Sequence, residues 1–544
     1  MENDERIKKI KDPLYGYIEV QEWLMKYIDT PEFQRLRNIR QTGYAALYPG
    51  ALHNRFVHSL GVFFLGNKAI LSFRKNVEEL SGKSPNEWDR WEKTFKLACL
   101  LHDVGHSPFS HTGEAFYETP SFRKILSEYL GIAELSKFGK PHEVMSAIVG
   151  KDLIEDFKDD LSSIDIELFV RCIIGAPYAD KKQYLYENAI IQMLNGKIID
   201  VDKIDYLVRD SYVTGYDTVN LDVDRLLDSY TILKIDGKEW VAYKHGALSV
   251  IENVAYANDL ERRWIQTNPT VLYDCKLLEH AIKEYDLYML NKYKKDLGGY
   301  SSVLCRMALS KEGIPLSKEK LRLLCDDDII VYLKNISQSD VGKQYYERYN
   351  RLIPMWKNEI DFAKIIGDKL GGEIIQNLQA EIARLTDGLG GMFFIDKKVK
   401  AALQKEHQSE IKQAKEAGIS QEAIRDREES YKNNIKIFEL FEDFIKIEGL
   451  PEFQFAIISS NRYESNYKKL ALEEVYVELG KNRIEKFSNT LTVNSVNSCI
   501  DVGEKIFYVY TSRVNKEHYE NKKKDIGEAW AEYVNENWRR VYEK

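Results

Sequence analysis

"LLHDVGHSPFSH", residues 100–111, places three histidines and an aspartate within twelve positions. The whole chain has 10 histidines in 544 residues, and six of them lie between positions 53 and 142. Neutral imidazoles beside carboxylates are costly to bury unless something organises them, and a divalent metal ion does so. Because His102 and Asp103 directly follow the apolar run "LACLL", this stretch predicts a metal site at the end of a buried helix.

Two other segments are expected to complete the metal site. His58 lies near the start of the neighbouring apolar helix, in "VHSLGVFFLG", where its side chain can face the same ion. The later helical segment "DVDKIDYLVRD" offers a fourth ligand from one of Asp200, Asp202, Asp205 and Asp210. A set of two histidines and two aspartates suits Mn, Fe, Zn, Ni or Mg. The six cysteines include no CxxC pair, and ligands of this type exclude a cysteine-rich structural zinc site.

Three further histidines are candidates for the chemistry beside the metal. Gly105 and Pro108 break the helix, so His106 and His111 are expected on a turn next to the ligands. His142, in "KPHEV", begins another helix. Such imidazoles can protonate a leaving group, an effect of about 10²–10⁴-fold. The alternative is that His106 and His111 only orient the metal ligands.

Two cations accompany these residues. Arg55 precedes His58 by three positions, and Lys203 directly follows Asp202. A bound metal ion lowers the pKa of its water from 15.7 to about 7, which provides a nucleophile at neutral pH. Fixed positive charges stabilise the charge that develops on a phosphoryl group. The residues therefore predict metal-assisted hydrolysis of a phosphate ester.

The chain is predicted to be mainly α-helical with a smaller α+β lobe at its C-terminal end. Helical periodicity dominates to about residue 385, and residues 396–446 are helical and rich in Lys and Glu, with a break at Gly418-Ile419-Ser420. After Pro451, "QFAIISS", "EEVYVEL" and "KIFYVYTS" have the pattern of strands. We expect a first domain over residues 1–395 and a C-terminal lobe over 396–544. The simpler interpretation of 396–446 is a solvated helical arm.

Composition limits the partners and the compartment. The net charge of −8 disfavours broad nucleic-acid binding, which depends on clustered Lys and Arg. We expect no apolar run to reach the roughly 18 residues of a membrane span, so no membrane partner is expected. The N-terminus, "MENDERIKKIKDPLYG", is charged and lacks an apolar signal region. With scattered cysteines, these features predict a cytoplasmic protein.

At the level of whole motifs, the chain resembles the HD-domain phosphohydrolases. The signature is His58, the His102-Asp103 doublet and a later aspartate. The longer strings "KDPLYGYIEV", "IDTPEFQRLRNIRQ", "PGALHNRFVHSLGV", "HDVGHSPFSH" and "IDVDKIDYLVRDS" are similar to the deoxynucleoside triphosphate (dNTP) triphosphohydrolases, especially those that join a sterile-alpha-motif domain to an HD domain. The likeness is dense to about residue 217. It implies an HD-type helical core and hydrolysis of dNTPs to deoxynucleoside and inorganic triphosphate.

The resemblance also assigns roles to individual residues. It implies that the metal ligands are His58, His102, Asp103 and Asp202, and that the catalytic group comprises His111, His142, His106 and Glu114. The substrate contacts it implies are Arg55, Lys203, Tyr206, Asp210, Gln41 and Thr42. Three positions at the site depart from the family pattern, and one of them is Ala257, which stands where a relative has a phosphate-binding Arg. Glu114 stands where relatives have Asp, and Thr42 replaces a Leu that crowds the sugar 2′ position, so partial acceptance of ribonucleotides is expected.

The same resemblance predicts regulation by a nucleotide. Asp29, Gln34 and Arg37, in "DTPEFQRLR", match a segment that receives an activating guanine nucleotide at a subunit interface. We therefore expect a homo-oligomer, most simply a tetramer, whose assembly responds to a guanine nucleotide or another nucleotide. The alternative is that Asp29 only caps the helix that starts at Pro31.

Two other functions remain open from the residues alone. One is an HD-domain hydrolase or phosphodiesterase acting on cyclic dinucleotides or guanosine alarmones. Hydrolases of cyclic dinucleotides carry a GYP motif, and hydrolases of guanosine alarmones have the motif HDxxED. This chain has HDVGH at the position of the second motif. The other is a catalytically silent nucleotide sensor, which substituted metal ligands would favour.

Overall fold

The computed structural model describes residues 6–81, 86–117, 124, 127–128, 130–158, 162–196, 199–216, 220–235, 238–293, 315–316, 319–320, 324–337, 339–388, 391–395, 397–416, 419–451, 454–461, 475–478, 483–489, 505–522 and 524–542. The chain forms two compact units. The first comprises Met1–Ile265, Ala281–Ser337 and Ser465–Asp501, and the second comprises Gln266–His280, Gln338–Glu464 and Val502–Lys544.

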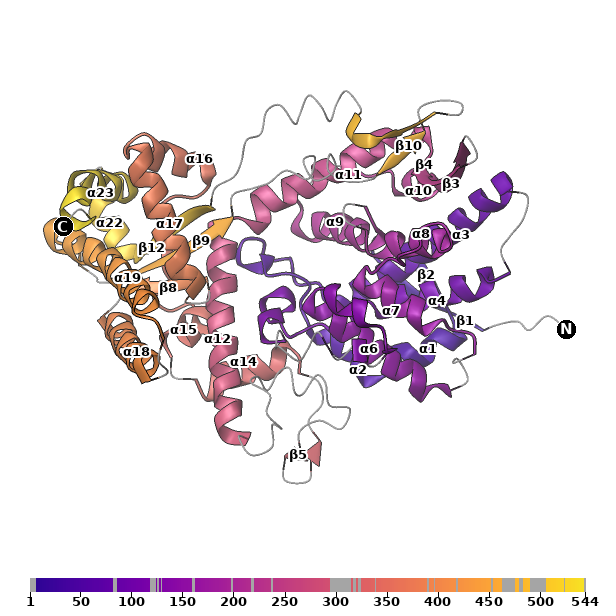
Figure 1. Ribbon diagram of the computed structural model, residues 1–544, viewed down its shortest axis with the longest axis horizontal. Coiled ribbons are helices and arrows are strands. Elements are labelled where there is room, and N and C mark those ends of the chain that lie inside the picture. Colours follow the sequence, from indigo (N-terminus) through magenta and orange to yellow (C-terminus); the bar gives the residue numbers. More distant parts are fainter. Residues whose placement is uncertain are drawn as a thin grey trace. The chain divides into compact units, whose positions relative to one another are not determined.

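The first unit is built on a group of packed helices. α3 (Arg55–Ser81), α4 (Trp88–Leu101), α7 (Ile166–Ile174), α8 (Leu185–Leu194) and α9 (Val201–Thr214) pack against one another (Figure 1). Every residue of α4 from Thr94 to Leu101 is buried, and the last five, Leu97–Leu101, are all apolar. α9 begins at its N-cap Asp200 and ends at Gly215, whose φ of 66° suits glycine. These boundaries place His102 and Asp202 at helix ends.

α3 is apolar over most of its length. By length and composition its segment Arg55–Glu79 could cross a membrane, contrary to the expectation from sequence, but 67% of its most apolar window is buried inside the protein. The central helix of a folded domain has the same character.

The remaining elements of the first unit surround this group. The helices include α1 (Glu22–Ile28), α2 (Pro31–Gln34), α6 (Pro141–Asp156), α10 (Val223–Leu227), α11 (Leu248–Glu261) and α14 (Asp326–Asn335). The strands β1 (Ile7–Asp12) and β2 (Gly16–Gln21) form an antiparallel hairpin, and β5 (Pro315–Leu316) pairs with β6 (Glu319–Lys320). α12 (Pro269–Tyr293) has residues in both units.

A four-stranded sheet in the first unit draws on distant parts of the chain. Its order is β11-β10-β4-β3, with β3 (Tyr230–Ile235) and β4 (Lys238–Tyr243) antiparallel. β10 (Tyr476–Glu478) runs parallel to β4, and Val477 is opposite Tyr243. β11 is Ile484–Lys486. The strand predicted from "EEVYVEL" therefore forms, but it pairs within the first unit.

The second unit is an α+β structure around one sheet. The order is β7 (Ile353–Pro354), β12 (Lys505–Thr511), β9 (Phe455–Asn461) and β8 (Met392–Ile395), all antiparallel. Ile506–Thr511 of β12 are all buried, so both faces of this central strand are covered. The helices include α15 (Asp340–Gly342), α16 (Glu359–Phe362), α17 (Gly372–Gly388), α18 (Lys397–Glu416), α19 (Gln421–Glu448), α22 (Arg513–Asn521) and α23 (Ile526–Tyr542).

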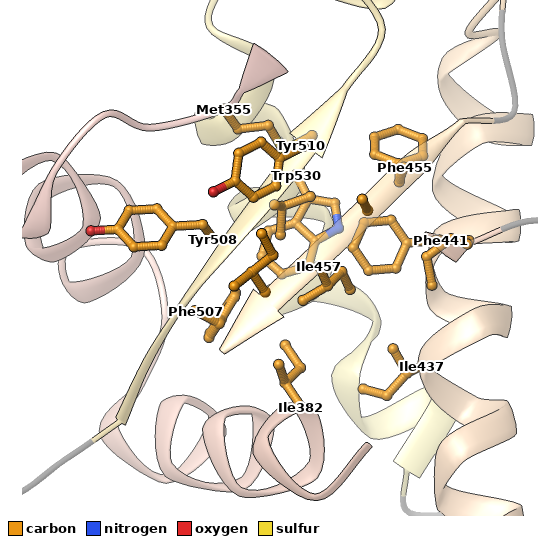
Figure 2. Close-up of a cluster of buried hydrophobic side chains, with 14 of the residues drawn as sticks. Met355, Ile382, Ile437, Phe441, Phe455, Ile457, Phe507, Tyr508, Tyr510 and Trp530 are labelled. Carbon is orange, nitrogen blue, oxygen red and sulfur yellow. The ribbon is translucent and has the colours of Figure 1, made fainter. Parts of the chain in front are cut away.

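Aromatic side chains fill the core of the second unit. Figure 2 shows Trp530 of α23 and Phe441 of α19 beside the strand residues Phe455 and Phe507. The rings of Phe441 and Trp530 stack with centroids 5.3 Å apart. Trp530 and Trp538, eight residues apart on α23, are both buried.

The predicted fold class is confirmed: the protein is mainly α-helical with a smaller α+β part. The break in the charged region is also found, because Ser420 caps α19 by accepting a hydrogen bond from the amide of Ala423. The compact units do not coincide with the boundary predicted after residue 395. That boundary falls inside the second unit, and Ser465–Asp501 belongs to the first because β10 pairs with β4.

Candidate metal centre and histidine cluster

Four side chains from α3, the turn after α4 and the start of α9 converge in the first unit. Nε2 of His58 lies 3.3 Å from Nε2 of His102. Asp202 Oδ1 lies 2.9 Å from the first of these nitrogens and 3.7 Å from the second. Asp103 Oδ2 lies 3.7 Å and 3.5 Å from the same two atoms. Ligand atoms about 2.1 Å from one ion lie about 3–3.5 Å apart at angles of 90–110°. The residues present therefore fit a divalent cation.

The structure distinguishes between the four aspartates of "DVDKIDYLVRD". Asp202 faces the two imidazoles, and its side chain is 37% exposed, so the cluster is open to solvent on that side. Asp200 instead caps α9 and accepts a hydrogen bond from the amide of Lys203. Asp205 contacts the other nitrogen of His58, and Asp210 lies beside His53.

A buried chain of charges holds His58 in place. The Nδ1 of His58 lies 2.7 Å from Asp205 Oδ2. Arg209 donates to both carboxylate oxygens of Asp205, at 2.9 and 3.0 Å, and to Asp12 Oδ2 at 3.1 Å. A Cβ at Gly61 would overlap the Asp205 carboxylate, so only glycine allows α3 and α9 to approach this closely. Sequence reasoning missed Arg209 and Asp12, although Asp205 and Arg209 have the i, i+4 spacing of a helical ion pair.

Arg55, predicted to bind substrate phosphate, lies within the protein interior. Its guanidinium pairs with Asp103 and donates through Nε to the hydroxyl of Ser110 at 2.7 Å. Only 3% of its side chain is exposed. Lys203 is also engaged, because its Nζ donates to the carbonyl of Gly196 at 2.7 Å and pairs with Asp200. In this structure both cations contact protein groups that a phosphate would have to replace or share.

A second cluster contains the predicted catalytic residues. Glu114 Oε1 lies 2.5 Å from Nδ1 of His111, 2.5 Å from Nδ1 of His142 and 3.6 Å from Nε2 of His106. The rings of His106 and His142 stack with centroids 4.3 Å apart. Glu114 therefore reaches both histidines despite replacing a shorter Asp. These four donors are close enough together to hold a cation as well.

Exposure separates the roles that these histidines can take. His106 is fully buried, and burial together with the charges of Arg55 and His142 lowers its pKa well below the usual value. The side chain of His111 is 66% exposed, so it can reach a bound substrate. Burial raises the pKa of Glu114, but His142 and His111 outweigh this and keep it well below its ordinary range. Glu114 is thus an anion that orients two imidazoles.

Close packing places α6 against the turn that follows α4. The turn after α4 approaches α6 so closely that a Cβ at Gly105 would overlap the backbone of Met145 and Ser146. The amide of Gly105 donates to the hydroxyl of Ser146 at 3.0 Å. Because His142 lies in the first turn of α6, this contact sets its distance from the turn that carries His106 and His111.

Of the residues predicted to contact the sugar, Gln41 and Asp210 are buried, and Thr42 and Tyr206 are half-buried. Asp210 Oδ1 lies 2.7 Å from Nε2 of His53, a residue for which no role is predicted. The amide of Gln41 donates to the carbonyl of His53 at 3.0 Å, so Gln41 and Asp210 share this neighbour. Gln41 Oε1 and Thr42 Oγ1 are buried without a hydrogen-bond partner. The hydroxyl of Tyr206 accepts a hydrogen bond from Asn258 at 2.9 Å.

The predicted regulatory residues lie near the surface of the first unit. Asp29 and Arg37 are exposed. Gln34 donates to the carbonyl of Ile28 at 2.8 Å and accepts from Arg37 Nε at 2.8 Å. The alternative role for Asp29 is wrong, because Thr30 is the N-cap of α2 and accepts a hydrogen bond from the amide of Phe33.

Comparison with known proteins agrees with this geometry. Residues 55–174 match the family described as HD domain, so the chain contains an HD domain. It is 34% identical over 223 residues to a deoxynucleoside triphosphate triphosphohydrolase SAMHD1 homolog of Dictyostelium discoideum, covering 41% of this chain and 39% of that protein. It is 31% identical to deoxynucleoside triphosphate triphosphohydrolase SAMHD1 of Danio rerio, covering 51% of this chain and 45% of that protein. The matches thus span less than half of each of these relatives.

A solved structure supports the fold. A hypothetical protein from Aquifex aeolicus superposes with a TM-score of 0.53 at 19% identity, covering 95% of this chain and 100% of that one. At this identity the likeness concerns the fold alone.

Metal binding is predicted to release a proton. Burial alone would lower the pKa of His58, but Asp202 and Asp205 outweigh it and raise the pKa to about 10. His58 therefore carries a proton at neutral pH that an ion must displace, and affinity should rise between pH 6 and 9 by about tenfold per pH unit for one proton. Titration of Mn²⁺ by calorimetry in buffers of different ionisation enthalpy would count the proton. An affinity that does not change with pH would contradict the assignment, and His102→Ala should abolish binding.

Asp205 is predicted to support the metal site without contacting the ion. In Asp205→Asn the amide would face either Arg209 or His58 with a donor in place of an acceptor, which disturbs the orientation of the imidazole. We expect metal affinity to fall by about 10–100-fold. Asp224→Asn, the same change at a residue whose side chain is 73% exposed, is the control. Equal metal affinity in both variants would show that Asp205 has no such role.

Proposed function

We propose that this HD-domain protein hydrolyses deoxynucleoside triphosphates at the α-phosphate and releases a deoxynucleoside and inorganic triphosphate. The observation that carries the proposal is the pairing of two clusters in one unit. His58 and His102 lie with Asp202 and Asp103 at distances that fit a cation. In a second cluster, which shares the turn after α4, Glu114 orients His111 and His142. The similarity to dNTP triphosphohydrolases supports the choice of substrate.

The chain's own residues supply positioning and proton transfer. A divalent ion held by His58, His102, Asp103 and Asp202 would polarise the phosphoryl group and lower the pKa of a water molecule. Glu114 accepts from Nδ1 of His111, so in the protonated form of this exposed ring Nε2 carries the proton that can pass to the departing 5′-oxygen. The ring then takes up a replacement proton from solvent. His142 shares the same carboxylate and fixes the position of Glu114.

The buried polar atoms near Asp210 support a sugar on that side. Gln41 Oε1 and Thr42 Oγ1 need hydrogen-bond partners, and sugar hydroxyls would provide them. Thr42 leaves more room than Leu for a 2′-hydroxyl, and one hydrogen bond contributes about 1 kcal/mol net. The preference for dNTPs over ribonucleotides is therefore several-fold and not absolute.

The products of the reaction test the proposal. Metal-loaded protein incubated with each dNTP in ¹⁸O-water should yield a deoxynucleoside and triphosphate that carries the label. His111→Gln should retain the metal and lower kcat by about 10²–10⁴-fold. Pyrophosphate or orthophosphate as the first product would instead indicate another HD-domain phosphohydrolase. Nucleotide binding without turnover would indicate a sensor.

Regulation by a nucleotide is the second part of the proposal. The exposed Asp29 can accept from guanine N1–H, and Arg37, fixed by Gln34, can donate to the acceptor edge of the base. An activator acts by binding the active assembly more tightly than the inactive one. GTP or a dNTP should therefore shift the protein towards a homo-oligomer, expected to be a tetramer, and raise turnover.

Asp29→Ala is predicted to remove the response to nucleotides and leave the metal content unchanged. The measurement is the mass distribution and the rate with and without each nucleotide. Because Thr30 caps α2, the variant should keep its thermal stability. If neither the rate nor the mass distribution of the wild type changes with any nucleotide, regulation is refuted and hydrolysis is not.

A further inference from the structure

The turn that carries His111 has an unfavourable backbone. Phe109 and Ser110 have φ angles of 55° and 56°, in the left-handed region that residues with a Cβ seldom adopt. Such conformations persist only where surrounding contacts over-determine them, and they gather at functional sites. The exposed His111 directly follows Ser110 in the chain. The groups that hold this turn therefore decide where His111 points.

A carboxylate more than two hundred residues away holds the turn directly. Asp326, in the first turn of α14, accepts a hydrogen bond from the amide of Phe109 at 2.6 Å through Oδ1. Its Oδ2 accepts from the amide of Arg40 at 3.0 Å. Asp326 is 5% exposed. The hydroxyl of Ser110 in turn donates to the carbonyl of Arg40. One side chain thus joins the catalytic turn to the residue that precedes Gln41.

Arg35 fastens the other end of the same turn. Its Nη2 donates to the carbonyls of Val104 and His106 at 3.0 and 2.8 Å, and its Nη1 donates to the carbonyl of Leu324 at 2.6 Å. Arg35 is 9% exposed. The segment Leu324–Asp326 therefore contacts the turn twice, through Arg35 at residues 104–106 and through Asp326 at Phe109.

We propose that Asp326 is a positioning residue, which with Arg35 clamps the left-handed turn and so sets the place of His111 relative to the metal cluster and to Gln41. The clamp itself follows from the contacts above, and its consequence for catalysis rests on the function proposed in the preceding section. Both carboxylate oxygens are needed as acceptors. The side-chain amide of an asparagine has the same shape as the carboxylate. Its oxygen could accept from one of the two backbone N–H groups, but its NH₂ group would face the other N–H group, and two donors cannot bond to each other.

A pair of aspartate-to-asparagine variants in one helical turn tests the clamp. Asp327, next to Asp326 in α14, is exposed and serves as the matched control. In Asp326→Asn, hydrogen exchange at the amides of Phe109 and Arg40 should accelerate by about tenfold or more, with peptides from α4 and the second unit unchanged. Mn²⁺ affinity should stay within about twofold, and kcat for a dNTP should fall at least tenfold, more than KM rises. Asp327→Asn should match the wild type in every measurement.

Arg35→Lys provides a second route if Asp326→Asn does not fold. It retains the charge but loses the fork that reaches two carbonyls, so faster exchange should centre on residues 104–106. Unchanged exchange at Phe109 and Arg40 in a folded Asp326→Asn would overturn the proposal. So would exchange that rises evenly through the first unit with loss of metal, which marks a general structural role. If the wild type turns over no dNTP, the proposed function fails, and hydrogen exchange still decides the clamp.

Discussion

Two buried imidazole nitrogens, Nε2 of His58 and of His102, lie 3.3 Å apart, and much of the first unit is arranged to hold them there. Two lone pairs at this distance repel unless a proton or a cation lies between them. The constraint requires α3, which carries His58, to approach both the end of α4 and the start of α9. Gly61 allows the close contact between α3 and α9, and the fully buried end of α4 fixes His102.

Buried arginines connect this centre to the rest of the unit. Arg209, Arg55 and Arg35 are each at most 9% exposed. Burying a charge is costly unless it is paired and hydrogen-bonded. Arg209 links Asp205 to Asp12, and Arg55 links Asp103 to Ser110, whereas the two Nη atoms of Arg35 donate to backbone carbonyls. Each arginine therefore joins segments far apart in sequence, and removing Asp205 or Asp103 would leave a buried arginine without its carboxylate.

Local patterns in the sequence were sufficient for the fold class and for the central residues of the site. Apolar periodicity predicts α3 and α4, and Gly215 and Ser420 mark helix boundaries that the structure has. The density of histidines between residues 53 and 142 indicates a shared ligand, because isolated buried imidazoles need no such grouping. The residues alone left four aspartates open as the fourth ligand, since all of them lie on one short helical segment.

The sequence by itself determined the elements and the chemistry of the site, because helix periodicity, caps and clustered ligand types are local properties. Only the tertiary structure decided which partners those residues have. It pairs β10 with β4 and turns Arg55 towards Asp103. It also directs Asp202, and not Asp200 or Asp205, towards the nitrogen atoms of His58 and His102 that face each other. In the sequence Asp326 has only the pattern of an acidic residue in the first turn of a helix, yet in the structure it accepts a hydrogen bond from the turn before His111. Contacts between segments that are hundreds of residues apart depend on how the helices pack, and no local pattern records that packing.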